Sequence, residues 1–333
     1  MVAYSAEHMG HVDSPGTGQG CPQQHQAAEG APVCVAVVIS FQNEAGHLPA
    51  LLRSLDAQTE PAEQVVLVDD GSDDGSPGIV AEYARNRPGV TVLSRPRRTA
   101  ARDRLADAPE LQAFVAGVEA LAEPWDVVAK IDGDLELSCT LFADVRARLR
   151  TDPGLGITGS YLSVIDPDGT RRREGHPEEH VRGPNKFYRR ACYEQITPLP
   201  EQLGWDTVDD LRARAKGWRT RSFAAAGGDT IHLRQTGSHD GRLRAFRRWG
   251  LCAWAYGAHP LAVLLGAARR ATMRPYLIGG VSYLYGWAAA AVTGYPRVEA
   301  ETRAFARRED LHRIGRLARR ALHVTPARSV SAR

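Results

Sequence analysis

The amino-acid sequence predicts an α/β protein built on a doubly wound, mostly parallel sheet. Short apolar runs alternate with amphipathic stretches along the first two thirds of the chain. The first run, Val33 to Ser40, is continuously apolar, which is typical of a strand buried on both faces. Strands that alternate with helices form parallel sheets covered by helical layers.

The periodicity of apolar residues then predicts the following elements in order. Helices are expected at 47–58, 79–86, 109–121, 139–149, near 191 and at 207–216, and strands at 65–68, 90–93, 127–131, 156–165, 181–188 and 224–233. Gly217 is placed to end the helix that precedes it, as a glycine beyond a helix C-terminus commonly does.

Composition is that of an ordinary globular protein and argues against several classes. The 333 residues suffice for one large or two modest domains, and a net charge of +3 gives no reason to expect a nucleic-acid partner. The five cysteines are scattered without a Cys-x-x-Cys pair, unlike a zinc site or a disulfide framework. A cytoplasmic location in a reducing compartment fits this pattern best.

The most informative stretch is Asp132-Gly133-Asp134, which follows the apolar run from Val127 to Ile131. Its carboxylates should lie at the carboxyl end of a parallel strand, where open α/β sheets bind ligands. Gly133 should let the backbone turn so that both carboxylates face one site. Such a pair suits a hard divalent cation with oxygen ligands, which can hold a diphosphate, although an ordinary strand-ending turn is the alternative.

An acidic loop from Asp69 to Ser76 follows the second predicted strand. Because neighbouring parallel strands end at the same edge of a sheet, this loop should approach the loop from Phe41 to Glu44. Carboxylates accept hydrogen bonds from base N–H groups and ribose hydroxyls. The sequence therefore predicts a nucleoside-binding site formed by the two loops.

Three further features are candidates for the same site. The basic stretch 95–104 could offset phosphate charge or could be a solvated loop. Asp206 begins a predicted helix, either as its N-terminal cap or as a general base. His232 ends the last predicted strand and could be a third metal ligand, although a single histidine is more often structural.

The C-terminal third differs in composition from the rest. Arginines crowd residues 242–333, and residues 276–295 contain no charge. That stretch is long enough to span a bilayer, but its Ala, Gly, Ser and Tyr residues drive insertion weakly. A helix pair at 246–265 and 276–295 is expected to lie on, or dip into, a membrane, with a buried helical hairpin as the alternative. Residues 299–322 are expected to form a charged helix. The predicted organisation is a disordered leader at 1–31, the sheet domain at 32–240, the helical extension at 241–322 and a disordered tail at 323–333.

In their order along the chain, these motifs resemble those of inverting glycosyltransferases of family 2, which have the GT-A fold. The loop from Phe41 to Glu44 resembles the family's Tyr-Asn-Glu loop, and Val68 to Ser72 matches its nucleotide loop. Ala101 to Asp103 resembles Ala-Arg-Asn, although the preceding Asn-x-Gly pattern is absent. Asp132 to Asp134 matches the metal-binding Asp-x-Asp motif.

The last matching motif is Trp205-Asp206 followed by Gly217-Trp218, which resembles Glu-Asp followed by Gly-Trp at the same separation. Trp205 replaces the family's Glu, so the catalytic role carries over to Asp206 alone. The Arg248-Trp249 pair lacks the Gln of the motif found in processive polysaccharide synthases, because Ala245 stands there. Transfer of a single sugar is therefore favoured.

The resemblance implies a nucleotide-diphospho-sugar donor, a Mg²⁺ or Mn²⁺ ion and a glycan or lipid-linked acceptor in envelope or exopolysaccharide synthesis. The residues expected to bind substrate are Phe41, Glu44, Asp69, Asp70, Arg102, Asp132 and Trp205, where Trp205 could equally be a core residue. The metal ligands would be Asp132, Asp134 and His232, and the catalytic base Asp206. The alternative is a non-catalytic sugar- or nucleotide-binding module on the same frame. The expected location of the protein is the cytoplasm, either at the cytoplasmic face of a membrane or free of it.

Overall fold

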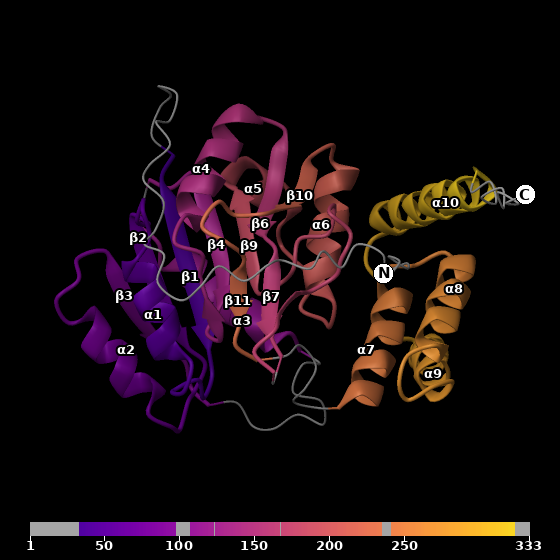
Figure 1. Cartoon of the computed structure of the whole chain (residues 1–333), viewed down its shortest axis with the longest axis horizontal. Helices are drawn as coiled ribbons and strands as arrows, with labels where there is room; N and C mark the ends of the chain where they lie inside the picture. Colours follow the sequence, from indigo (N-terminus) through magenta and orange to yellow (C-terminus); the bar gives the residue numbers. More distant parts are fainter. Residues whose placement is uncertain (1–32, 98–106, 123, 167, 235–240, 324–333) are drawn as a thin grey trace, which may run out of the picture. The chain divides into compact units, whose positions relative to one another are not determined.

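The computed structural model describes residues 33–97, 107–122, 124–166, 168–234 and 241–323. Within these, residues 33–234 form one compact unit and residues 241–323 belong to a second (Figure 1). Arg102 lies outside the described residues, so its predicted role in donor binding stays a prediction.

The first unit contains a seven-stranded sheet in the order β10-β6-β9-β4-β1-β2-β3. Every neighbouring pair is parallel except those of β9, which runs antiparallel to both β4 and β6. The predicted α/β class with a mostly parallel sheet is therefore confirmed. The strands are β1 (Val35–Phe41), β2 (Gln64–Asp69), β3 (Val90–Ser94), β4 (Val127–Asp132), β6 (Leu155–Ser160), β9 (Asn185–Arg189) and β10 (Arg219–Phe223).

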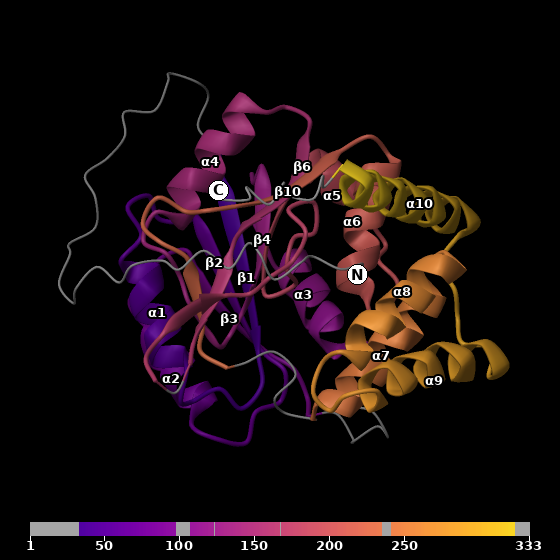
Figure 2. The same ribbon diagram turned by 45° about the vertical axis from the view of Figure 1, so that its right-hand side comes forward.

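Strand β1 shows why the apolar runs are continuous. Val37 and Ile39 point into a core cluster on one face, while Ala36 and Val38 point into a second cluster on the other. The first face is covered by α1 (Leu48–Asp56), α2 (Ser76–Ala84) and α4 (Leu141–Thr151), and the second by α3 (Pro109–Glu119), α5 (Arg190–Ile196) and α6 (Trp205–Ala215). Figure 2 shows these helical layers on the two sides of the sheet.

A second, four-stranded sheet in the order β5-β11-β7-β8 carries part of the site. Its strands are β5 (Leu135–Glu136), β7 (Leu162–Ile165), β8 (Arg171–Arg173) and β11 (Thr230–His232). Pairing of β11 with β5 sets His232 opposite Leu135. This register brings the end of β11 beside the turn that follows β4.

Strands β9, β10 and β11 differ from the sequence-based expectation. Strand β10 was not predicted, because exposed Arg219 and Arg221 alternate with buried Thr220 and Ser222, so the strand lacks an apolar pattern. The strand predicted at 224–233 is reduced to β11, and the one predicted at 181–188 begins only after Pro184. Proline has no N–H to donate to a sheet, so it suits the residue before a strand.

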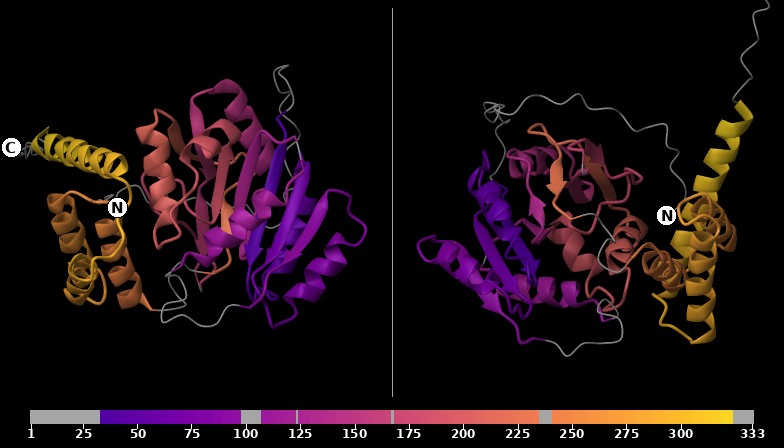
Figure 3. Two further views of the ribbon diagram at one scale, coloured as in Figure 1. Left: turned by 180° about the vertical axis from the view of Figure 1, so that it is seen from behind. Right: turned by 60° about the horizontal axis from the view of Figure 1, so that its bottom comes forward.

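The second unit contains the helices α7 (Arg242–Ala255), α8 (Pro260–Ala271), α9 (Ile278–Val292) and α10 (Ala300–His323). The single helix predicted at 246–265 is wrong: Gly257 adopts φ +75° and Pro260 begins α8, so the chain breaks into two helices. Figure 3 shows α7, α8 and α9 from two further directions. Among the helices of the described residues, none combines the length and the apolarity that crossing a bilayer requires.

Packing between α7 and α9 depends on glycines. An added Cβ at Gly250 would lie 1.9 Å from the carbonyl oxygen of Tyr283, and one at Gly286 would lie 2.0 Å from that of Arg247. The two helix backbones therefore approach so closely that no side chain fits between them.

Gly117 permits an equally close approach of α3 to the sheet, and this yields a stability prediction. A Cβ at Gly117 would lie 2.3 Å from Val38 Cγ1. We predict that Gly117→Ala lowers the free energy of unfolding by about 1–3 kcal/mol, the usual cost of overpacking a core. The measurement is urea denaturation followed by circular dichroism.

The control for this prediction is Gly78→Ala in α2, where an added Cβ would meet nothing within 4 Å. There the better helix propensity of alanine should leave stability unchanged or raise it by up to about 1 kcal/mol. Equal effects of the two substitutions would contradict the packing argument.

Candidate functional site

The loops that follow β1 and β2 are joined by hydrogen bonds. Gln42 Nε2 donates to the carbonyl oxygen of Asp70 (2.8 Å), and the amide of Asn43 donates to Ser72 Oγ (2.9 Å). The amide of Asp73 in turn donates to Asn43 Oδ1 (2.9 Å). The predicted meeting of the two loops at one edge of the sheet is confirmed.

Asp69 and Asp70 lie in this double loop with different surroundings. Asp69 Oδ1 accepts a hydrogen bond from the amide of Ser72 (2.9 Å), which shapes the turn. Asp70 Oδ1 accepts one from Arg95 Nη1 (2.7 Å), so a guanidinium group stands beside the carboxylate. Both carboxylates are largely buried, and nucleoside binding by either residue stays a prediction.

Gly133 packs closely against Phe41 and Glu44. An added Cβ at Gly133 would lie 2.7 Å from Phe41 Cβ and 3.3 Å from Glu44 Cγ. Gly133 does not adopt a positive φ, so glycine is required here by the close approach of β1 rather than by a sharp turn. Phe41 itself is buried at the end of β1, under the loop that it was predicted to help form.

Asp134 is surrounded by cationic groups. His232 Nε2 lies 3.6 Å from Asp134 Oδ2, and Arg234 Nε lies 4.0 Å from the same oxygen. The other ring nitrogen of His232, Nδ1, lies 3.3 Å from Glu174 Oε1, and Glu174 is bound in turn by Arg182 Nη2 at 2.7 Å. Acidic and basic side chains therefore alternate through the site.

His232 and Asp134 shift each other's pKa in opposite directions. Burial disfavours a charged imidazole, but hydrogen bonds to Asp134 and Glu174 raise the pKa of His232 to about 9. Burial likewise opposes ionisation of Asp134, yet His232 and Arg234 hold its pKa below the usual value. In this state the pair is an imidazolium facing a carboxylate.

Arg234 also connects this pair to the loop after β1. Its Nη2 donates to both carboxylate oxygens of Glu44 (2.8 and 2.6 Å), and Glu44 Oε2 lies 2.7 Å from His47 Nδ1. Glu44 was predicted to bind the nucleoside, and the structure places it in an ion pair at the metal motif. Arg234 was not among the predicted site residues, because its partner Glu44 lies 190 positions away.

The residues around Asp134 supply only part of the coordination that a divalent cation needs. Within the described residues, no three His, Cys, Asp or Glu side chains are grouped to hold a metal ion. Asp134 and His232 do offer one carboxylate oxygen and one imidazole nitrogen, and a cation would replace the imidazole proton. Mg²⁺ and Mn²⁺ commonly take one or two protein ligands and complete their coordination with phosphate oxygens and water.

The carboxylate of Asp132 faces away from this pair and towards Lys130. Lys130 Nζ forms an ion pair with Asp132 Oδ1, and its side chain is only 1% exposed. Burial alone would lower the pKa of Lys130, but Asp132, Glu110 and Asp206 raise it above the usual value for lysine. Lys130 therefore carries a charge between Asp132, which was predicted as a ligand of metal and substrate, and Asp206.

Asp206 is the second residue of α6, and Gly204, not Asp206, is the N-terminal cap. A Cβ added at Gly183 would lie 2.8 Å from Asp206 Oδ2, so only glycine leaves room for this carboxylate. The carbonyl oxygen of Asp206 accepts a hydrogen bond from Lys186 Nζ at 2.5 Å. The cap alternative is therefore set aside, and the role as base stays a prediction.

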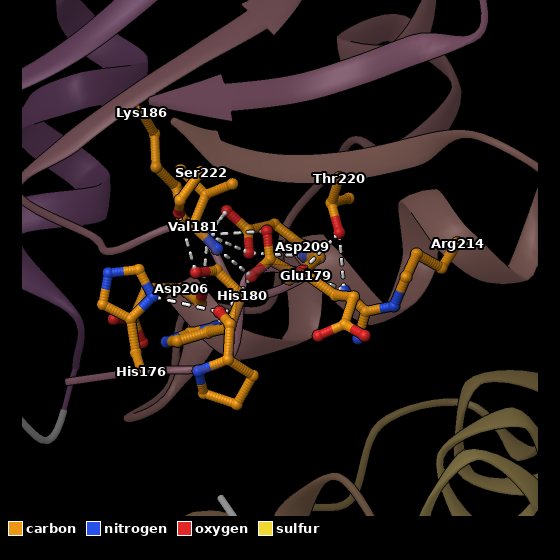
Figure 4. Close-up of polar contacts among 12 residues, drawn as sticks. His176, Glu179, His180, Val181, Lys186, Asp206, Asp209, Arg214, Thr220 and Ser222 are labelled. Atoms are coloured by element: carbon orange, nitrogen blue, oxygen red, sulfur yellow. Dashed lines mark hydrogen bonds and ion pairs between the residues drawn. The ribbon is translucent and has the colours of Figure 1, made fainter. Parts of the chain in front are cut away.

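A buried ionic cluster fixes α6 next to β9 (Figure 4). Lys186 Nζ, which is inaccessible to solvent, donates to both oxygens of Asp209 (2.6 and 2.8 Å) and to Asp210 (3.2 Å). Burial alone would lower the pKa of Lys186, but Asp209, Asp210 and Asp206 raise it. The hydroxyl of Tyr188 also donates to Asp209 (2.6 Å).

His180 completes the cluster as a neutral side chain. Its burial and the charge of Lys186 lower its pKa well below the usual value. Its Nδ1 lies 2.8 Å from Asp210 Oδ2 and can donate a hydrogen bond to it. The carboxylates of Asp209 and Asp210 therefore both have fixed partners.

Lys130 and Lys186 lie directly opposite each other in the register of β4 and β9. Trp205, between the base and these lysines, is buried in the core cluster of the α3 face, and its ring centre lies 5.7 Å from Lys130 Nζ. This position agrees with the alternative that Trp205 is a core residue. Motif reasoning missed Lys130, whose ion-pair partner Asp132 lies on the same strand and whose other neighbours, Trp205 and Asp206, lie on α6.

Comparisons with known proteins agree with this geometry. The family model described as "Glycosyl transferase family 2" matches residues 36–200. A mannosyltransferase, PcManGT from Pyrobaculum calidifontis, solved with GDP-Man and Mn²⁺, is 18% identical with a TM-score of 0.51; the match covers 87% of this chain and 81% of that one. GalNAc-T7, solved with UDP, GalNAc and Mn²⁺, is 16% identical with a TM-score of 0.54; the match covers 80% of this chain and 59% of that one. No curated protein sequence matches the chain. These likenesses confirm the GT-A fold.

The buried cluster makes a stability prediction. We expect Lys186→Met to leave Asp209 and Asp210 without their cation and to lower the free energy of unfolding by about 3–5 kcal/mol, as when one partner of a buried ion pair is removed. The measurement is chemical denaturation of the variant beside the native protein.

The matched control is Arg221→Met, which breaks an exposed pair between Arg221 and Glu178. Solvent screens such pairs, so the change should cost less than about 1 kcal/mol. A Lys186 variant as stable as this control would show that the cluster does not hold α6 in place.

Proposed function

Because the chain belongs to glycosyltransferase family 2, we propose that it transfers a sugar from a nucleotide-diphospho-sugar to an acceptor hydroxyl with inversion at the anomeric carbon. The observation that carries this proposal is the charged Lys130. It pairs with Asp132 of the Asp-x-Asp motif and lies within electrostatic reach of Asp206. The donor-binding motif and the proposed base therefore belong to one site.

In this proposal Asp134 and His232 hold Mg²⁺ or Mn²⁺. When bound, the ion offsets the negative charge that develops on the diphosphate leaving group. Support comes from the Mn²⁺ and nucleotide ligands of the two structural neighbours described above. Arg234, released from or shared with Glu44, supplies a second positive charge at the same place.

The chain's own residues carry the remaining roles. Asp69, Asp70 and Glu44 line the joined loops and would accept hydrogen bonds from the base and ribose. Asp206 would take the proton from the acceptor hydroxyl as that oxygen attacks from the face opposite the leaving diphosphate. Attack from that face inverts the anomeric configuration.

The acceptor and the location are part of the proposal. We infer a glycan or lipid-linked acceptor of the envelope or of an exopolysaccharide, and a cytoplasmic protein in peripheral contact with the membrane. The motivation is the arginine-rich, apolar second unit. The unit of residues 33–234 would then be the catalytic domain.

Donor binding is tested by a thermal-shift panel of nucleoside diphosphates and nucleotide sugars, with and without Mn²⁺. Ligands that bind only the native state raise the melting temperature with occupancy. We expect a metal-dependent rise for one nucleotide family, and its loss in Asp134→Ala.

Glu82→Ala is the control for that panel, because Glu82 is exposed on α2 and pairs with Arg85 at the C-terminal end of that helix. Its shift should equal that of the native protein. A metal-dependent shift that survives in Asp134→Ala would remove Asp134 from the metal site.

Catalysis is tested with Asp206→Asn, which retains the shape of the side chain without its basicity. We expect this variant to keep the nucleotide-induced thermal shift and to lose at least about 10²-fold in kcat, the usual contribution of a general base. The measurement is release of nucleoside diphosphate in the presence of acceptor, with NMR of the product anomer. Full activity would exclude Asp206 as the base, whereas donor binding without transfer by the native chain would favour a binding module.

A further inference from the structure

Large exposed apolar side chains are concentrated in the second unit. Among the described residues, thirteen large apolar side chains are exposed, and twelve of them belong to residues 241–323. The exception is Ile165, at the end of β7. Soluble surfaces rarely gather such residues in one place unless something covers them.

Helix α8 presents its three leucines to the outside. Leu261, Leu264 and Leu265 are exposed, and Leu264 reaches 58%. The inner face instead carries Arg270, which is 5% exposed and lies between the rings of Trp249 and Tyr283 at 5.0 and 4.2 Å. The largest aliphatic side chains of α8 therefore lie on its outer side, whereas its inner side holds the smaller Ala262, Val263, Gly266 and Ala267 beside Arg270.

Helix α9 and the segment before it extend this apolar surface. Leu277 and Val281 are 71% and 65% exposed. The exposed positions of α9 recur at helical spacing, so they form one stripe along it, and the opposite side packs on α7 through Gly286. This stripe holds the apolar residues Ile278, Val281, Tyr285 and Val292.

The charge of the same unit is strongly positive. Residues 241–323 contain fifteen arginines, no lysine and four acidic residues. Exposed Arg269 and Arg274 stand directly before the apolar segment that begins at Tyr276. Apolar side chains next to arginines match the two layers of an anionic bilayer surface, namely the acyl region and the charged headgroups.

We propose that α8, the connection 272–277 and α9 form a membrane-contact surface that lies in the interface of an anionic bilayer. At about 1.5 Å per residue, the 15 residues of α9 extend only about 22 Å, which suits a helix lying in the plane rather than crossing it. The positive charge favours a bilayer over a second copy of the chain, because two such units would repel each other. This surface specifies the peripheral membrane contact proposed above and rests on that part of the proposed function, whereas it does not depend on the sugar transfer itself.

The test is flotation of the full chain with vesicles of phosphatidylglycerol and phosphatidylcholine in equal parts, compared with phosphatidylcholine alone. We expect binding to the anionic vesicles that weakens with added salt. The variant Leu277→Glu with Val281→Glu should bind at least about tenfold more weakly, because it puts charge where apolar contact is needed.

Ile165→Glu is the matched control, since it makes the same kind of change at a residue that is 53% exposed in the other unit. It should bind vesicles as the native chain does. Both variants should retain the native circular dichroism and the Mn²⁺-dependent nucleotide shift, which separates loss of membrane contact from failure of the catalytic unit.

Three results would overturn the proposal. The first is that the native chain fails to float with anionic vesicles, and the second is that the double variant floats as well as the native chain. Alternatively, light scattering shows that the native chain is a dimer which the double variant dissociates, and the apolar surface is then an interface between copies.

Discussion

The candidate site depends on two lysines that the register of the sheet places directly opposite each other. Because β9 runs antiparallel to β4, Lys130 and Lys186 are register partners, and both are buried. Two ammonium groups in this position would repel each other unless carboxylates surround them. Helix α6 supplies those carboxylates with Asp206, Asp209 and Asp210, while β4 adds Asp132. The charge of the lysines therefore determines where the proposed base lies.

The charged side chains around the Asp-x-Asp motif are also paired with side chains of opposite charge. Glu44, Asp134 and Glu174 alternate with Arg234, His232 and Arg182, so each carboxylate already has a cation beside it. A nucleoside diphosphate that enters together with a divalent cation adds little net charge to such an arrangement. Rearranging charged side chains in a largely buried site when a ligand binds would cost free energy. Here the side chains of opposite charge are already in place before binding.

The parts that the sequence predicted correctly are those with a local cause. Strands β1, β2 and β4 are recognisable because both of their faces are buried, and the acidic loops follow them directly in the chain. Gly217 ends α6 as expected, with φ +89°. Strand β10 escaped prediction because it lies at an edge and is half polar.

The polar partners of the site could not be predicted, because their causes are distant in sequence. Arg234 pairs with Glu44 through a contact that only the folded chain creates, and Lys130, beside its strand neighbour Asp132, meets Trp205 of α6 in the same way. The motif Asp132-Gly133-Asp134 predicted a pair of metal ligands, yet the side chains diverge towards Lys130 and His232. Spacing along a strand does not determine which neighbour each carboxylate meets.

The second unit follows a different physical rule from the first. Helices α7 and α9 approach closely through Gly250 and Gly286, and twelve large apolar side chains among the described residues of this unit are exposed. Arg270 is kept inside by ring contacts, and the carbonyl oxygen of Gly266 accepts its Nη1–H at 2.8 Å. In water this arrangement exposes the residues that gain most from burial and buries one that loses hydration. The same arrangement is favourable where the outer side of α8 and α9 meets acyl chains and the surrounding arginines meet phosphate groups.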